Sequence, residues 1–146
     1  MATVTVFDVA KYILVKRGDM SAMKLQKLIY YSQAWSLVWD DVPLFDNRIE
    51  AWANGPVSPD LYSRHRGQYG VSAWDFRADA TGTLSEKQIE TIDAVLEAYG
   101  GKSAQWLSDQ THAELPWKKA RVGLLDSDRS NSPITYESMA EYYGSL

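Results

Sequence analysis

The sequence has no cysteine and only two histidines among its 146 residues. The absence of cysteine excludes disulfide bonds, thiolate catalysis and cysteine-ligated zinc, and it is consistent with an intracellular origin. No apolar run approaches the roughly 20 residues that a membrane-spanning helix needs. The amino-terminal segment carries Asp8 inside its apolar stretch and basic residues after it, which is the reverse of a signal peptide. These absences predict a cytoplasmic protein without a membrane segment.

Signatures of catalysis are also scarce. The sequence holds no glycine-rich phosphate-binding motif. His65 lies between two arginines, whose charge opposes its protonation, and we expect it to be exposed. His112 and Glu114 are two positions apart, whereas ligands on one helical face are three or four apart, so no zinc site is expected. The sequence predicts no enzyme, metal or cofactor; a hydrolase built on His112 and Glu114 is the remaining enzymatic alternative.

The charge balance argues against nucleic acid as a partner. The formal net charge is −4, and no helix-turn-helix or RNA-recognition motif is present. Two small basic clusters occur, one from Arg64 to Arg66 and one formed by Lys118, Lys119 and Arg121. On an acidic protein such clusters are usually solvated faces or docking points for an acidic partner.

Helical periodicity dominates what the sequence does contain. From Ser21 to Trp39, apolar residues recur on two faces, one of them formed by Tyr31, Ala34 and Val38, and this pattern predicts a central helix covered from two sides. Capping residues predict further helices that begin at Thr5, Ser58, Ser85, Ser103, Pro116 and Thr135. The predicted fold is mainly α: one compact domain over residues 1–146, with six or seven helices and a small β element, either a hairpin or short strands.

The stretch IEAWANGPVSPDLY, residues 49–62, contains the predicted β element and the start of a helix. Residues 48–53 alternate as a short strand does, and the chain is expected to turn at Asn54-Gly55-Pro56, because glycine and proline cannot both continue a strand. Ser58 and Pro59 then begin a short helix. Glu50 lies inside the strand beside Trp52, and we expect it to be buried and paired rather than catalytic.

Three segments in order, residues 23–35, 43–62 and 107–121, resemble the Panacea antitoxin domain, a family of SocA-like and often phage-associated antitoxins. The resemblance spans residues 19–121. It implies a mostly helical antitoxin of a type II-like toxin–antitoxin pair, which neutralises a cognate protein toxin by direct binding. The alternative that the resemblance implies is a proteolytic adaptor, which delivers the toxin to a ClpXP-type protease. The oligomeric state is left open.

The resemblance alone does not decide which residues contact a toxin and which hold the fold, so we divide the candidate residues between these two roles. The structural motif is expected to contain Glu50, Gly55, Pro56, Pro59, His112, Glu114 and Trp117. Partner-binding residues are expected to be Lys24, Tyr31, Trp52, Asn54, Tyr62 and Arg66. Within the second group, we expect Trp52 and Tyr62 to lie at the rim of a groove beside the central helix, where aromatic anchors contribute most to binding.

Overall fold

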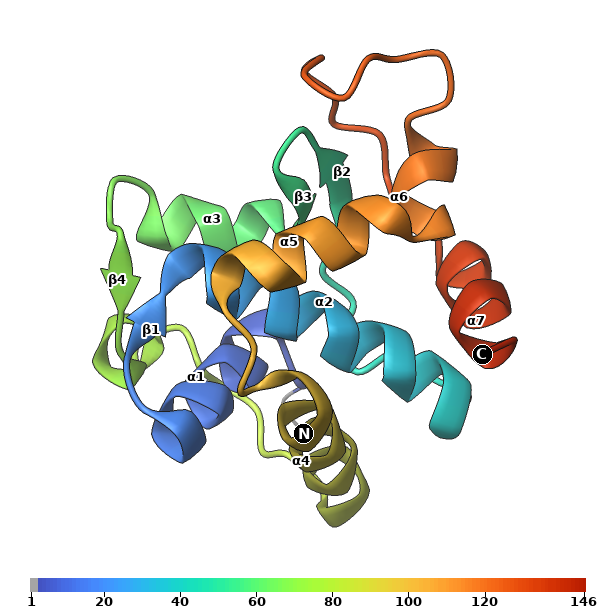
Figure 1. Cartoon of the computed structure of the whole chain (residues 1–146). Helices are drawn as coiled ribbons and strands as arrows, with labels where there is room; N and C mark the ends of the chain where they lie inside the picture. The colour runs from blue at the N-terminus through green and yellow to red at the C-terminus, as the bar shows by residue number, and fades with distance from the viewer. Residues whose placement is uncertain (1–2) are drawn as a thin grey trace.

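The computed structural model describes residues 3–146, which form seven α-helices, a short 3-10 helix and two small antiparallel sheets (Figure 1). The helices are α1 (Val6–Arg17), α2 (Ala22–Trp39), α3 (Pro59–His65), η1 (Ala73–Phe76), α4 (Glu86–Tyr99), α5 (Ala104–Ala113), α6 (Leu115–Ala120) and α7 (Tyr136–Gly144). The strands are β1 (Met20–Ser21), β2 (Glu50–Trp52), β3 (Gly55–Val57) and β4 (Gly70–Val71). Strand β1 pairs with β4, and β2 pairs with β3. The prediction of a mainly α fold is confirmed.

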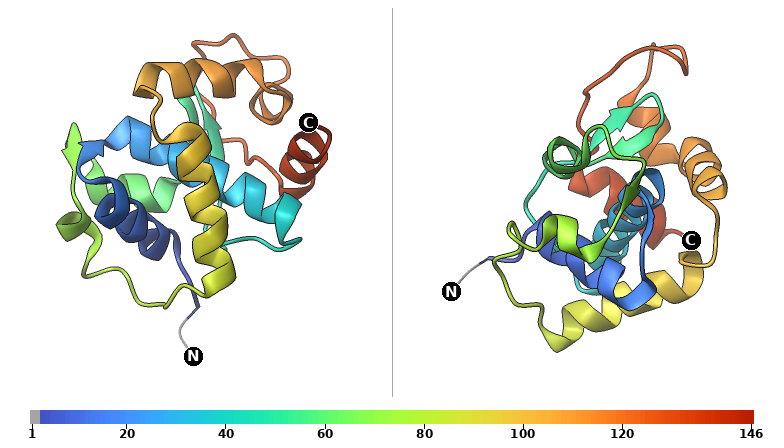
Figure 2. Two further views of the ribbon diagram at one scale, coloured as in Figure 1. Left: turned by 60° about the horizontal axis from the view of Figure 1, so that its bottom comes forward. Right: turned by 90° about the vertical axis from the view of Figure 1, so that its left-hand side faces the viewer.

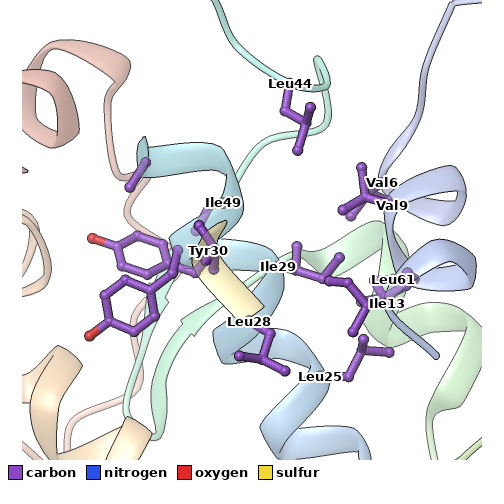
Figure 3. Close-up of a cluster of buried hydrophobic side chains, with 14 of the residues drawn as sticks. Val6, Val9, Ile13, Leu25, Leu28, Ile29, Tyr30, Leu44, Ile49 and Leu61 are labelled. Carbon is purple, nitrogen blue, oxygen red and sulfur yellow. The ribbon is translucent and has the colours of Figure 1, made fainter. Parts of the chain in front are cut away.

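Helix α2 is the centre of the fold, as its two apolar faces predict. It contacts α1, α4, α5 and α7, and the left view in Figure 2 shows α4 lying across it. Figure 3 shows Leu25 and Ile29 of α2 beside Ile13 of α1 and Leu61 of α3. All four side chains are fully buried, so each contributes about 1.5–3 kcal/mol through removal from water. The central helix is therefore held by apolar packing on several sides.

Local capping chemistry sets where several helices begin. Thr5 and Asp8 form a capping box at the start of α1, and Ser85 and Gln88 form another at the start of α4. The Ser21 hydroxyl accepts a hydrogen bond from the backbone N–H of Lys24 at the start of α2. These side chains satisfy backbone N–H groups that have no partner within the helix. The caps predicted at Thr5 and Ser85 are confirmed, and Ser21 caps α2 in the same way.

The β-hairpin corrects one prediction. Its turn lies at Ala53-Asn54, and Gly55 and Pro56 belong to the return strand β3, with Trp52 opposite Gly55 and Ala51 opposite Pro56. Proline has no N–H to donate, and it is tolerated at position 56 because the Ala51 carbonyl opposite needs no hydrogen bond from β3. The Ala51 N–H donates to the Ser132 carbonyl, and the Ala51 carbonyl accepts from the Arg121 guanidinium. Proline in a strand requires such a position, free of ladder hydrogen bonds.

The chain between α6 and α7 returns to this hairpin. Ile134 N–H donates to the Ile49 carbonyl, and Pro133 forms a β-bridge with Glu50, so residues 132–134 lie alongside β2. In Figure 1 the loop between α6 and α7 lies at the same end of the molecule as the hairpin. This return places residues 129–131 beside strands that come much earlier in the sequence.

Candidate functional site

A cleft of about 810 Å³ opens between the hairpin, the first half of α2, α3 and the segment 129–131. Its volume lies within the range of protein ligand sites. Helix α2 contributes Met23, Gln26 and Lys27, and the hairpin contributes Glu50, Trp52, Ala53, Asn54 and Val57. Helix α3 contributes Tyr62 and His65, and the returning loop adds Arg129, Ser130 and Asn131. The cleft thus combines residues from four separate parts of the chain.

Two aromatic rings line this cleft, in the position beside the central helix that the sequence indicates. Trp52 and Tyr62 are half-buried, and their ring centroids are 5.0 Å apart in an edge-to-face arrangement. Tyr62 also meets the His65 ring edge-to-face at 5.4 Å. Such pairs hold aromatic rings in fixed orientations. The pair therefore forms a rigid aromatic surface, and its contact with a partner stays a prediction.

Glu50 is buried and fully paired, as expected. One of its carboxylate oxygens accepts from the Arg48 guanidinium at 2.5 Å, and the other accepts from the Trp52 indole N–H at 2.8 Å. Arg48 is itself exposed. Because a neighbouring cation and an indole satisfy this carboxylate, its role is to orient Trp52 within the cleft wall.

His65 is buried, and this corrects the expectation of exposure. Only 5% of its surface is accessible. The Gln26 side-chain nitrogen lies 3.0 Å from His65 Nε2, and the same amide binds the backbone N–H and carbonyl of Ser58. With the Gln26 nitrogen as the donor, His65 Nε2 accepts and the ring is neutral. Burial lowers the pKa of His65, which favours the same neutral form. The arginines on either side of it in sequence are exposed instead.

Lys27 is the least expected residue of the cleft. Its side chain is 1% exposed, and its ammonium group donates one hydrogen bond, to the Pro56 carbonyl at 3.3 Å. No ion pair involving Lys27 occurs within residues 3–146. Burial lowers the pKa of Lys27 to about 8, because a low-dielectric environment disfavours its charged form. Within the described residues, a buried lysine that lines the cleft thus has no counter-ion.

Helices α5 and α6 attach the hairpin to the fold. His112 Nε2 lies 2.9 Å from the Ala53 carbonyl, and the Trp117 indole donates to the Trp52 carbonyl at 2.8 Å. The two rings pack together with centroids 4.1 Å apart. In its structural role His112 fixes the end of its own helix, where its Nδ1 contacts the Ser108 carbonyl. Its second contact, with the hairpin turn, has no signal in the local sequence.

Glu114 and Tyr31 form part of a buried network, which corrects one partner-binding assignment. Tyr31 is fully buried, and its hydroxyl donates to Glu114 Oε1 at 2.7 Å. The Tyr143 hydroxyl lies 2.8 Å from the same oxygen. Tyr31 was expected among the partner-binding residues, yet it lies in the core between α2, α4 and α7, where a partner has no access to it. Glu114 holds these elements together, in the structural role expected of it.

Gly55, Pro56 and Pro59 take part in the architecture of the hairpin and α3. Gly55 has a φ of 116°, and a Cβ atom there would lie 2.7 Å from Lys27 Cε. The Pro56 carbonyl accepts from Lys27, and Pro59 is the first residue of α3. Each of the three therefore has a physical reason to belong to the structural motif.

Of the three remaining residues expected to bind a partner, only one lines the cleft. Asn54 is exposed in the hairpin turn and lines the cleft. Lys24 is half-buried and Arg66 is exposed, and neither borders the cleft. Of this group, Trp52, Tyr62 and Asn54 are thus brought together, whereas Lys24 and Arg66 lie apart from them.

Sequence reasoning missed Gln26, Lys27, His65 and the segment 129–131. A signal for Lys27 was present, because it lies one helical turn before Tyr31 and so extends the second apolar face of α2. No comparable local signal marks residues 129–131, which reach the cleft only through long-range pairing.

Arg121 belongs by sequence to a basic cluster with Lys118 and Lys119, and its burial corrects the interpretation of that cluster as a solvated face. Its guanidinium donates to the carbonyls of Ala51, Leu125, Asp126 and Asp128.

Across residues 3–146, no group of three His, Asp or Glu side chains is placed to hold a metal ion. In the same range, no helix is both long and apolar enough to cross a bilayer.

Comparison with known proteins identifies the family. Residues 25–118 match the family described as Antitoxin SocA-like, Panacea domain. No curated protein and no solved structure gives a match. The matched range covers more than half of the chain and includes most of α2, the hairpin, α3 and the His112–Trp117 support of the cleft. The chain therefore belongs to the SocA-like antitoxin family and carries a Panacea domain over residues 25–118.

Proposed function

We propose that this protein is the antitoxin of a type II-like toxin–antitoxin pair and neutralises a cognate protein toxin by direct binding. The observation that carries the proposal is the family match over residues 25–118, which contains every cleft-lining residue except Met23 and the segment 129–131. Because the cleft also needs residues 129–131, we treat residues 1–146 as one binding unit acting in the cytoplasm. Neutralisation requires no catalytic step, since occupying the toxin's working surface is sufficient.

The composition of the cleft supports a protein partner. Trp52 and Tyr62 offer a rigid aromatic centre, and tryptophan and tyrosine are enriched among residues that dominate binding energy at interfaces. Met23 is partly exposed on the α2 side, where its flexible side chain can adapt to a partner. Arg129 and Asn131 are exposed at the opposite side. An apolar centre with a polar rim is the usual anatomy of a protein interface.

The test is co-expression of this chain with the neighbouring gene, since antitoxins of this kind are usually encoded beside their toxins. The wild-type chain is expected to restore growth and to be recovered with the neighbouring gene product in a stoichiometric complex. Trp52→Ala and Tyr62→Ala should each weaken that complex by about 1–3 kcal/mol or more. Trp74→Ala and Tyr69→Ala are matched controls, because these aromatic side chains are 73% and 89% exposed and lie outside the cleft.

Each outcome of this test decides a separate point. Unchanged affinity in folded Trp52→Ala and Tyr62→Ala would place the binding surface elsewhere on the chain. Failure of the wild type to restore growth would reject the antitoxin function. Restored growth with loss of the toxin, and its return when a ClpXP-type protease is deleted, would favour the proteolytic adaptor over direct neutralisation.

A further inference from the structure

The buried ammonium group of Lys27 gives the cleft a preference for negatively charged groups. A lysine ammonium carries three N–H donors, yet Lys27 donates one hydrogen bond, to the Pro56 carbonyl. In residues 3–146, no carboxylate lies within 4.0 Å of it. Buried lysines are normally paired, because an uncompensated charge away from water is costly. Two donors therefore remain for a group that enters the cleft from outside.

Packing alone does not explain a lysine at this position. Its aliphatic chain lies against Gly55, so closely that a Cβ on that glycine would be 2.7 Å from Lys27 Cε. A methionine would fill a similar space without bringing a charge out of water. A destabilising group that the fold nevertheless encloses, at the wall of an open cleft, is a pattern typical of functional sites.

The charges that line the cleft are complementary to an anion. Lys27 and Arg129 bring two positive charges, and Glu50 is the one acidic residue among the lining side chains of the described chain. The Glu50 carboxylate already binds Arg48 and the Trp52 indole, so its charge is compensated. His65 adds no charge when its ring accepts from Gln26. A chain with a formal net charge of −4 thus contains a locally positive cleft.

We propose that Lys27 anchors a carboxylate-binding site in this cleft, which takes an acidic side chain or a terminal carboxylate from a segment of a bound protein. The single buried ammonium matches a single negative charge, whereas a dianion such as phosphate would bring a second charge that only the exposed Arg129 could meet. Trp52 and Tyr62 supply aromatic surface for the rest of the segment, and the side-chain amide of Asn54 can bind its backbone. That the carboxylate comes from a protein rests on the proposed antitoxin function.

The test follows the Lys27 ammonium by NMR in the full-length chain with isotope-labelled lysine. The probes are three short peptides: a blocked glycine peptide with a central glutamate, its glutamine counterpart, and a glycine peptide with a free terminal carboxylate. Inorganic phosphate is the fourth probe. The Lys27 resonance is expected to move with the glutamate peptide or the free carboxylate, which identifies the source, and the glutamine peptide should bind at least about tenfold more weakly.

Lys27→Met should abolish the binding of the carboxylate peptides. Lys24→Met is the matched control, since Lys24 is on the same helix but does not border the cleft, and it should leave binding unchanged. Should Lys27→Met fail to fold, the wild type still decides the matter, because a bound carboxylate must raise the pKa of Lys27. Equal binding of the glutamate and glutamine peptides, a response to phosphate alone, or a stationary Lys27 resonance would overturn the proposal.

The inference and the proposed function fail in different ways. Carboxylate binding by the isolated chain, without rescue from the neighbouring toxin, would leave the site standing and remove the antitoxin function. Neutralisation of the toxin by the wild type and by Lys27→Met alike, with an unmoved Lys27 resonance in the complex, would keep the function and reject the site.

Discussion

Gly55 and Lys27 occupy adjoining space so tightly that a Cβ on Gly55 would lie 2.7 Å from Lys27 Cε. Gly55→Ala should therefore displace a buried side chain, and it also places alanine at a φ of 116°. We expect a loss of about 2–4 kcal/mol in the free energy of unfolding, the sum of backbone strain and overpacking. Urea unfolding measures it, and NMR of the Lys27 ammonium should report its displacement.

Gly123→Ala is the control for that experiment. Gly123 also has a positive φ, of 89°, but a Cβ on this glycine would have no atom within 4 Å. The variant should lose only the strain component, about 1 kcal/mol. Equal losses for the two variants would mean that Lys27 does not restrict Gly55.

Replacement of Lys27 by methionine should change how stability depends on pH. Burial lowers the pKa of Lys27 to about 8 from 10.5, so between these values the unfolded chain holds a proton that the folded chain has released. The contribution of Lys27 to stability therefore rises as pH increases from about 8 to about 10.5, by roughly 3 kcal/mol. Lys27→Met should remove this rise. Urea unfolding of both proteins across that range measures the difference; parallel pH profiles would contradict the expectation.

Tyr143→Phe should lower the free energy of unfolding near neutral pH. It should also make that free energy fall less steeply at alkaline pH. The Tyr143 hydroxyl lies 2.8 Å from Glu114 Oε1 and 3.0 Å from the Tyr30 hydroxyl, and its loss should cost about 1–2 kcal/mol. Burial raises the pKa of Tyr143 well above its ordinary value of 10.0. This contribution is fully present below about pH 10 and declines at higher pH, where the unfolded chain ionises first. Urea unfolding should show a shallower alkaline decline in the variant, and Tyr69→Phe, at an exposed tyrosine, should match the wild type.

Arg121→Lys should loosen the segment that closes one side of the cleft. The arginine donates to the Ala51 carbonyl at 2.8 Å and to the Asp128 carbonyl at 2.6 Å, and a lysine cannot span both in the same geometry. We expect the free energy of unfolding to fall by about 2–4 kcal/mol, because buried carbonyls lose a charged hydrogen-bond donor. Hydrogen exchange should accelerate at the amides of Ala51 and Ile134, which pair this segment with the hairpin. Lys118→Met, at an exposed position, is the control; equal exchange in both variants would contradict the role given to Arg121.

The boundaries of the helices were predictable because their signals are local. Thr5, Ser21 and Ser85 each bind a backbone N–H within their own helix, so the cap and the group it satisfies lie three residues apart. The position of Pro56 was not predictable in this way. A proline in a strand depends on which side of the strand carries the hydrogen bonds, and here that is decided by Arg121 and Ser132, far along the sequence.

The residues of the candidate site fall into the same two groups, those with a local sequence signal and those placed by long-range contacts. Trp52 and Tyr62 were expected beside the central helix, and the structure places both on the cleft. Lys27, His65 and Arg121 are charged or titratable residues, and all three are buried. Each is enclosed by backbone or side-chain partners from other elements, namely Pro56, Gln26 and Ala51. Burial of a polar residue depends on such partners, which a single sequence does not specify.

The pairing of residues 132–134 with β2 has a consequence for biosynthesis. Protein chains emerge from the ribosome from the amino terminus onward, at about 5–20 residues per second. Helix α2, the hairpin and α3 are complete long before Ile134 is added and can bond to Ile49. The cleft therefore gains its last wall late in translation, and a nascent chain that stalls before this point presents an unfinished binding surface.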